Sequence, residues 1–192
     1  MASLKLMVVA LMAAALHGQE TKPVIDNERV TVWDVTAEPR LVRTMDHDAV
    51  VMELMGSHAR TASFILKGGV YKPAGVRSLL IELKDRPVDP IENKTGYPLA
   101  FPRPHVKKLL ENDRVIVWSY RWNPGEPTPM HFHDKDVVVV YLEDTALTST
   151  TPDGKKTLNQ YKAFDIRFNK RDRTHTELLE HGTGSAMMME LK

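Results

Sequence analysis

Two parts of the chain begin with nearly the same sequence, and this internal repeat limits the folds that the chain can adopt. Residues 24–33 (VIDNERVTVW) align without a gap with residues 109–118 (LLENDRVIVW), sharing Asn, Arg, Trp and two Val. The endings also match, because IELK at 81–84 corresponds to MELK at 189–192. Matched beginnings and matched endings indicate that one folding unit has been duplicated.

The duplication divides the chain into a first half, residues 24–84, and a second half, residues 109–192, joined by residues 85–108. Proline lacks the backbone N–H that helices and central strands need, and the joining segment is rich in it. We therefore predict an extended linker that crosses the surface. Its prolines are Pro87, Pro90, Pro98, Pro102 and Pro104. Three of its residues are expected to attach it to one half: Tyr97, Leu99 and Phe101.

Within each half the residue pattern is that of β-strands. Segments rich in β-branched and aromatic residues predict strands at 115–120, 137–142, 157–161, 164–168 and 185–191. The sequence TPDG at 151–154 is typical of a hairpin turn. Four consecutive valines, Val137–Val140, favour a strand that is covered on both faces. The sequence thus predicts an all-β fold in which the many short strands of each half form a sandwich or a barrel.

The first residues have the pattern of a signal peptide. Residues 1–5 are positively charged, and residues 6–16 form an apolar run that is short for a membrane span. We predict cleavage near Gly18, which makes 1–18 the signal peptide and the mature protein secreted or periplasmic, without membrane contact. The alternative is a short buried N-terminal helix. The chain has no Cys, so neither a lipid anchor on Cys nor a disulfide is possible.

The charge balance argues against nucleic acid as a partner. The 26 Lys and Arg residues are offset by 25 Asp and Glu residues, which leaves a formal charge of +1. The basic residues are also scattered along the chain, whereas nucleic-acid binding requires a basic patch. We expect a small-molecule ligand instead.

A His-x-His pair in the second half is the clearest candidate for chemistry. Residues two apart on a strand point to the same side, so His131 and His133 can face one ion while Phe132 packs the other way. Neutral imidazole binds transition metals such as Zn, Fe and Ni. A third ligand must come from another strand, and His175 is the candidate because it follows a predicted strand and a polar turn.

These residues give the chain a resemblance to the cupin superfamily. Gly125 is followed by five residues and then by His131-x-His133, which matches the first cupin motif. The second motif is similar to residues 163–175, although Lys170 and Asp172 replace its Pro and Gly. The resemblance covers about residues 24–192 and implies two jelly-roll barrels in tandem (a bicupin). It also implies a divalent metal ion (Fe, Zn, Ni or Mn) at His131, His133 and His175.

The second half departs from the cupin pattern at one ligand. The glutamate of the first motif falls at Val137 or Val138, and neither side chain can coordinate a metal. The resemblance therefore implies a site of three histidines. Asp136 is an alternative ligand if a bulge redirects it. Glu177 and His181 are further candidates, and Glu177 has the same strand parity as His175.

The first half has lost the site and is expected to act as a structural partner. Arg43 and Met45 stand opposite the His-x-His pair when the two halves are aligned. The position of His175 is either taken by Ser78 or deleted, and both alternatives leave no ligand.

Two functions follow from the resemblance. The first is a metalloenzyme acting on a small oxygenated molecule, a dioxygenase before an isomerase or lyase. A hydrolase is disfavoured because no general base is evident beside the histidines. The alternative is a non-catalytic periplasmic protein that binds a small molecule or carbohydrate. The chain would be a monomer or a homodimer. The residues expected to line the substrate pocket are Tyr120, Trp122, Glu126, Arg173 and Glu177.

Overall fold

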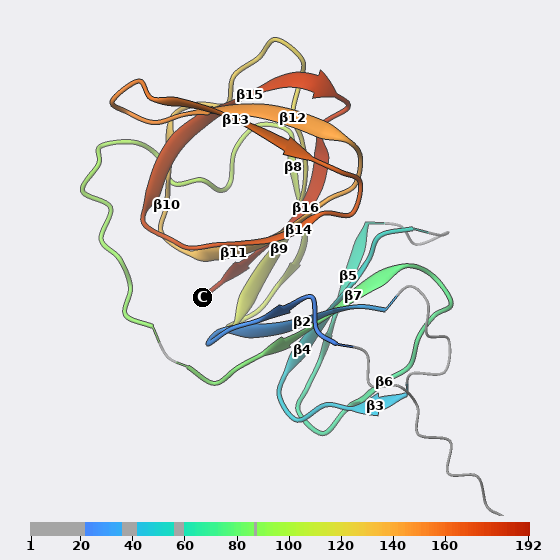
Figure 1. Cartoon of the computed structure of the whole chain (residues 1–192). Helices are drawn as coiled ribbons and strands as arrows, with labels where there is room; N and C mark the ends of the chain where they lie inside the picture. The colour runs from blue at the N-terminus through green and yellow to red at the C-terminus, as the bar shows by residue number, and fades with distance from the viewer. Residues whose placement is uncertain (1–21, 36–41, 56–59, 87) are drawn as a thin grey trace, which may run out of the picture.

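The computed structural model describes residues 22–35, 42–55, 60–86 and 88–192 (Figure 1). These residues form sixteen β-strands and no helix, which confirms the predicted all-β class. Within this part of the chain, no helix has the length and hydropathy of a membrane span. The predicted signal peptide at 1–18 lies outside the described residues and stays a prediction.

The first half is built on one five-stranded antiparallel sheet in the order β1-β2-β7-β4-β5. A two-stranded ribbon of β3 and β6 packs beside it. Its strands are β1 (Ile25–Asp26), β2 (Val30–Asp34), β3 (Arg43–Thr44), β4 (Ala49–Glu53), β5 (Thr61–Ile65), β6 (Val70–Tyr71) and β7 (Ser78–Leu83).

The second half is a barrel of two facing sheets, in the orders β14-β11-β16-β9-β8 and β10-β15-β12-β13. Its strands are β8 (Val106–Glu111), β9 (Val115–Arg121), β10 (His131–His133), β11 (Asp136–Tyr141), β12 (Thr145–Thr150), β13 (Lys156–Tyr161), β14 (Ile166–Asn169), β15 (Arg173–Gly182) and β16 (Ser185–Leu191). The strand predicted to begin at Phe164 begins instead at Ile166. Phe164 has a φ of 69°, which belongs to a turn and not to a strand.

The duplication extends to the strand order. The five-stranded sheets of the two halves have the same connectivity. The order is β1-β2-β7-β4-β5 in the first half and β8-β9-β16-β11-β14 in the second. The ribbon of β3 and β6 corresponds in the same way to the pair β10 and β15. The hairpin of β12 and β13 has no counterpart among the described residues of the first half. The first half is therefore a reduced copy of the second.

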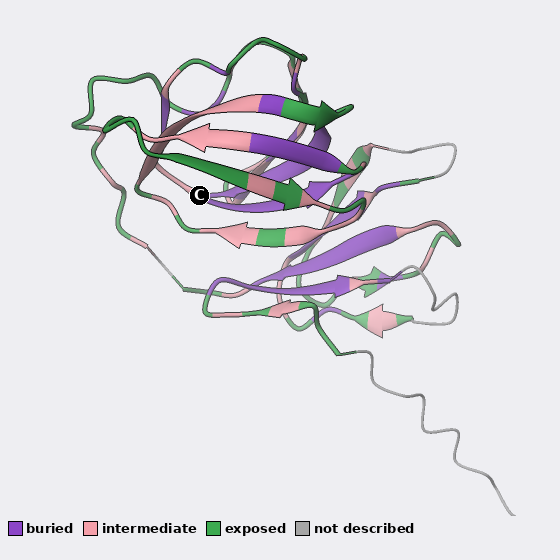
Figure 2. Cartoon of the chain, turned by 45° about the horizontal axis from the view of Figure 1, so that its top comes forward, coloured by how far each residue is buried: buried purple, intermediate pink, exposed green. Residues whose placement is uncertain are grey.

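Strand β11 belongs to the sheet of the second half that faces the first half, and all of its residues are buried (Figure 2). Val138 and Val140 belong to an apolar core shared with the first half. Val137 and Val139 face the interior of the second barrel. Successive strand residues point to opposite sides, so all four valines are buried, as the run of valines predicted.

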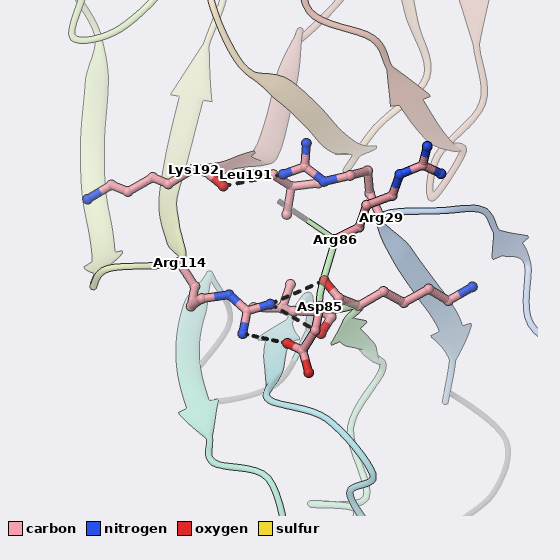
Figure 3. Close-up of a pocket in the computed structure, with 8 residues that line it drawn as sticks. Arg29, Asp85, Arg86, Arg114, Leu191 and Lys192 are labelled. Carbon is pink, nitrogen blue, oxygen red and sulfur yellow. Dashed lines mark hydrogen bonds and ion pairs between the residues drawn. The ribbon is translucent and has the colours of Figure 1, made fainter. Parts of the chain in front are cut away.

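Two ion pairs cross between the halves in a reciprocal arrangement. Arg29 of the first half contacts Asp136 of the second at 2.8 Å, and Arg114 of the second contacts Asp48 of the first at 3.2 Å. Each arginine also donates to a main-chain carbonyl at the end of the other half. Figure 3 shows Arg29 reaching the carbonyl of Lys192, while Arg114 reaches toward Asp85 and the last carbonyls of the first half. The repeated Arg of the two opening segments is therefore an interface residue.

The C-terminal end of the linker lies against the second barrel. Phe101 is buried and stacks on Trp118 with ring centroids 5.4 Å apart. The side chains of Tyr97 and Leu99 were also expected to attach the linker to the barrel. They are 37% and 41% exposed, so that prediction is wrong for these two side chains. The backbone holds this stretch instead, because Leu99 forms a parallel bridge with Phe132. Strand β8 begins at 106, within the segment predicted as linker.

Candidate metal centre

The structure brings His131, His133 and His175 together inside the second barrel. His131 and His133 lie on β10, and His175 lies on β15 directly opposite His131 in the antiparallel register. The Nε2 atoms of His131 and His133 are 3.2 Å apart, and those of His133 and His175 are 3.3 Å apart. All three candidate ligand atoms lie within 4.8 Å of one another. Three imidazoles from two strands thus converge on one point.

Hydrogen bonding and burial give His131 the form that a metal requires. Its Nδ1 lies 2.7 Å from the carbonyl oxygen of Pro129, which can only accept, so Nδ1 is the donor and Nε2 carries the lone pair. Burial lowers the pKa of His131 to about 3, and the charge of Arg103 adds to this effect. Burial also lowers the pKa of His133 and of His175. All three rings are therefore neutral at neutral pH, the state in which imidazole coordinates metals.

The spacing of the ring nitrogens fits a transition-metal ion. Ligand atoms about 2.1 Å from one ion at angles of 90–109° lie about 3.0–3.4 Å apart. The two Nε2 separations at this cluster, 3.2 and 3.3 Å, fall in that range. The donor set is uncharged and made only of nitrogen, which suits Fe, Zn or Ni better than Mg or Ca. The residues present therefore fit a divalent transition metal.

Glu177 places a carboxylate beside the cluster. Its Oε1 is 4.0 Å from His175 Nε2, and its Oε2 accepts a hydrogen bond of 3.0 Å from the ring N–H of Trp122. Burial alone raises the pKa of this carboxyl, but the charge of Arg103 and the hydrogen bond from Trp122 are among the interactions that outweigh burial and hold its pKa below the ordinary value. The expectation that no general base stands near the histidines is wrong, because Glu177 is ionised and adjacent to them.

Two of the alternative ligands are occupied or distant. Both oxygens of Asp136 are engaged, one by Arg29 and the other by the backbone N–H of Arg171. Asp136 therefore belongs to the interface between the halves, and the proposed bulge is absent from β11 and its neighbours. His181 is exposed near the far end of β15, opposite Ala146. Neither residue completes the site.

Arg103 is a residue of this site that the sequence did not reveal. Its Nη1 lies 2.9 Å from His131 Nε2, and its Nη2 lies 3.8 Å from Glu177. The guanidinium packs over the rings of Tyr120 and Phe101, 4.1 and 4.8 Å from their centroids. Arg103 comes from the linker and not from a barrel strand, so neither motif spacing nor strand parity could identify it. The sequence offered one signal for it, because Arg103 stands between Pro102 and Pro104, two residues after Phe101.

Two spaces of different size lie beside Arg103, the residue that contacts His131. An inner cavity of about 20 Å³, enough for roughly one water molecule, is lined by the histidines at 133 and 175 together with Arg173 and Glu177. An outer pocket of about 380 Å³ is lined by Tyr120 and Glu126, among others. Arg103 lines both. Of the five residues predicted to line a substrate pocket, Tyr120 and Glu126 line the outer pocket, and Arg173 and Glu177 line the inner cavity. Trp122 lines neither space and donates a hydrogen bond to Glu177. That a substrate binds in either space stays a prediction.

The first half holds no comparable site at the corresponding strands. Arg43 pairs with Tyr71 across β3 and β6 in the register in which His131 pairs with His175. Tyr71 is therefore the counterpart of His175. The assignment of Ser78 to that position is wrong, because Ser78 lies on β7, which corresponds to β16.

The residues at the corresponding positions of the first half pack against neighbouring side chains. Arg43 lies over the ring of Trp33, 4.2 Å from its centroid, and forms an ion pair of 3.6 Å with Glu82. Met45 and Tyr71 are buried in the same apolar cluster. Packed side chains therefore stand at the positions of β3 and β6 that correspond to His131 and His175.

Solved structures with similar folds identify the architecture. A cupin 2 conserved barrel domain protein from Leptotrichia buccalis matches 88% of this chain and 87% of its own, with a TM-score of 0.51 and 13% sequence identity. The chain therefore has the cupin fold. A cupin domain from Bordetella pertussis is 26% identical and covers 50% of this chain, with a TM-score of 0.43. The identity to the Leptotrichia cupin is low, so the likeness extends to the fold and not to the activity.

One curated protein is similar to this chain in sequence. The β-alanine degradation protein BauB of Pseudomonas aeruginosa is 40% identical to it over 62 residues, which are 32% of this chain. The match spans 61% of the length of BauB. No protein-family model matches the chain.

Proposed function

We propose that this protein binds one divalent transition-metal ion in its second barrel and acts on a small oxygenated molecule there. The observation that carries the proposal is the convergence of three neutral imidazoles at ligand spacing. His131, His133 and His175 would hold the ion. The proposed ion is Fe, Zn, Ni or Mn, and a dioxygenase is the first candidate activity, before an isomerase or lyase.

The residues around the histidines support chemistry at this point. A bound ion would supply Lewis acidity and, if it is iron, redox chemistry with O₂. Glu177 is the carboxylate that lines the inner cavity, and the Trp122 N–H fixes it in place. It is therefore the group able to accept a proton from a substrate and to return it. The small inner cavity limits the water that can compete with a substrate.

Metal content tests the proposal directly. The mature protein is purified without a His tag, and its metals are measured by inductively coupled plasma mass spectrometry. The expected result is close to one transition-metal ion per chain. Oxygen uptake is then followed with small diketones and catechols, and with β-alanine because of the name of the related BauB. A protein that takes up no transition metal, even when supplied with each candidate ion, would contradict the proposal.

The second candidate is a non-catalytic protein that binds a small molecule or a carbohydrate. The observation in its favour is the contrast in size between the two spaces, since only the outer pocket of about 380 Å³ admits a ligand larger than water. A metal-free protein whose unfolding temperature rises with a ligand of the outer pocket would favour this function. Metal-dependent turnover would rule it out.

We also propose that the protein is exported. The charged and apolar segments at residues 1–16 support this, with cleavage near Gly18. The test is to express the full chain in a bacterium and to sequence the N-terminus of the protein recovered from the periplasm and medium. A protein that stays in the cytoplasm with residues 1–18 attached would contradict export.

A further inference from the structure

Arg103 lines both the outer pocket and the inner cavity, so it lies where the two spaces are nearest to each other in the lining. The side chain is 6% exposed, and its guanidinium is flanked by the rings of Tyr120 and Phe101. A molecule that enters from the outer pocket therefore meets this guanidinium before it reaches the histidines.

The hydrogen bond from Arg103 to His131 is incompatible with a metal at the site. Arg103 Nη1 is 2.9 Å from His131 Nε2, the nitrogen whose lone pair would coordinate the ion. One lone pair cannot serve both partners, so metal binding must release this N–H. The Nε of Arg103, which is buried, already has no hydrogen-bond partner among the described residues. The metal-bound site would thus contain a buried guanidinium with two N–H groups to satisfy.

The charge balance of the inner cavity points in the same direction. Its lining contains two arginines, Arg103 and Arg173, and one carboxylate, Glu177. The surplus is one positive charge, and a divalent ion raises it to three. Uncompensated charge in a buried site is costly, and an anionic ligand would offset it.

We propose that Arg103 binds the carboxylate of a small anionic substrate, and that this carboxylate and the metal ion bind cooperatively. The proposal rests on the proposed function and names the class of molecule that the site takes. A planar guanidinium with free N–H groups matches a carboxylate in shape and charge. The outer pocket provides the room for the remainder of the molecule.

Metal affinity, not turnover, tests this proposal. The dissociation constant for Zn²⁺ is measured on the metal-free full chain by competition with a chromophoric chelator. Each titration is repeated with propionate and with its uncharged analogue propionamide. The variants are Arg103→Gln, which removes the charge, and Arg103→Lys, which keeps the charge but loses the planar pair of N–H donors. Arg167→Gln is the matched control, since Arg167 is half exposed and pairs only with Asp165 among the salt bridges of the described residues.

In the wild type and in Arg167→Gln, propionate should tighten Zn²⁺ binding by about fivefold or more, and propionamide should not. In Arg103→Gln the effect of propionate should disappear, while Zn²⁺ alone binds more tightly than in the wild type because the competing N–H is gone. Arg103→Lys should keep only part of the coupling. Equal tightening by propionate in the wild type and in Arg103→Gln would overturn the inference and leave the metal site standing. A wild type that binds no Zn²⁺ or other candidate ion would overturn both.

Discussion

Arg29 and Asp136 form a 2.8 Å ion pair buried between the two halves of the molecule, although they are 107 residues apart in the sequence. Their side chains are 7% and 8% exposed. The reciprocal pair, Arg114 with Asp48, is 3.2 Å long and considerably more exposed, at 35% and 21%. The duplicated contact has therefore become unequal, and the two pairs should differ in their contribution to stability.

Replacing Arg29 by Met should destabilise the protein by about 3–5 kcal/mol, because it leaves the Asp136 carboxylate buried without its cation. Replacing Arg114 by Met should cost about 1 kcal/mol or less, as expected for a partly exposed pair. The measurement is urea unfolding followed by the fluorescence of the three tryptophans. Similar losses in the two variants would contradict the assigned difference in burial.

Replacing His175 by Ala should weaken transition-metal binding by about a hundredfold or more, since one of three ligands is lost. The fold should persist, because the side chain lies at the cavity and contributes little to the apolar cores. His181→Ala is the control on the same strand, and it should bind metal like the wild type. Unchanged metal affinity in His175→Ala would remove His175 from the site.

Replacing Val137 by Glu should add a carboxylate to the inner cavity, which Val137 lines, and should tighten binding of divalent ions about tenfold or more. Replacing Val138 by Glu places the same charge in the apolar core between the halves, so it should destabilise the protein by several kcal/mol without any gain in metal affinity. The rise in unfolding temperature with added Zn²⁺ measures both effects. Weaker metal binding in Val137→Glu would contradict the orientation of β11.

The sequence predicted the features that depend on local periodicity. Strand parity placed His131 and His133 on one side of β10, and the run Val137–Val140 predicted a strand buried on both faces. The counterpart of His175 could not be found in this way. The described residues of the first half contain no counterpart of the β12–β13 hairpin, so the length of the gap in the alignment was undetermined. The pairing of Arg43 with Tyr71 identifies the position.

Replacing Gly182 by Ala should destabilise the protein by about 3 kcal/mol or more, because its added Cβ would lie 2.0 Å from the carbonyl oxygen of Asp144. Gly182 also has a φ of +88°, which L residues rarely adopt. Gly154 is the matched control. Its φ is +82°, but nothing lies within 4 Å of an added Cβ, so Gly154→Ala should cost only about 1–2 kcal/mol. Equal urea midpoints for the two variants would refute the close contact.

A chain ending at Lys84 should not fold cooperatively. The first half contributes residues such as Val50 and Ile81 to an apolar core whose other side belongs to the second half. Removal of that side exposes the core to water, and a reduced copy of 61 residues has little other surface to bury. The expected result is binding of the dye ANS and no sharp thermal transition. A cooperative transition in this fragment would show that the shared core is dispensable.

The position of Arg103 at the candidate metal centre could not be predicted from the sequence, for a different reason. Its partners His131, Glu177 and Tyr120 lie on three strands far from it in sequence, and no repeat or motif includes the linker. Its role depends on where the linker meets the barrel. That meeting is fixed by tertiary contacts such as the stack of Phe101 on Trp118, which a pattern of residue types does not encode.

The connector between tandem domains is usually where a protein accepts changes in length. In this molecule the last part of the connector is tied to β10 by the hydrogen bonds from Phe132 N–H to Pro98 and from Ala100 N–H to Phe132, and it ends in Arg103. A reporter sequence or a new terminus is therefore best placed upstream of Pro98, whereas a single residue added after Ala100 would shift the guanidinium out of the second barrel.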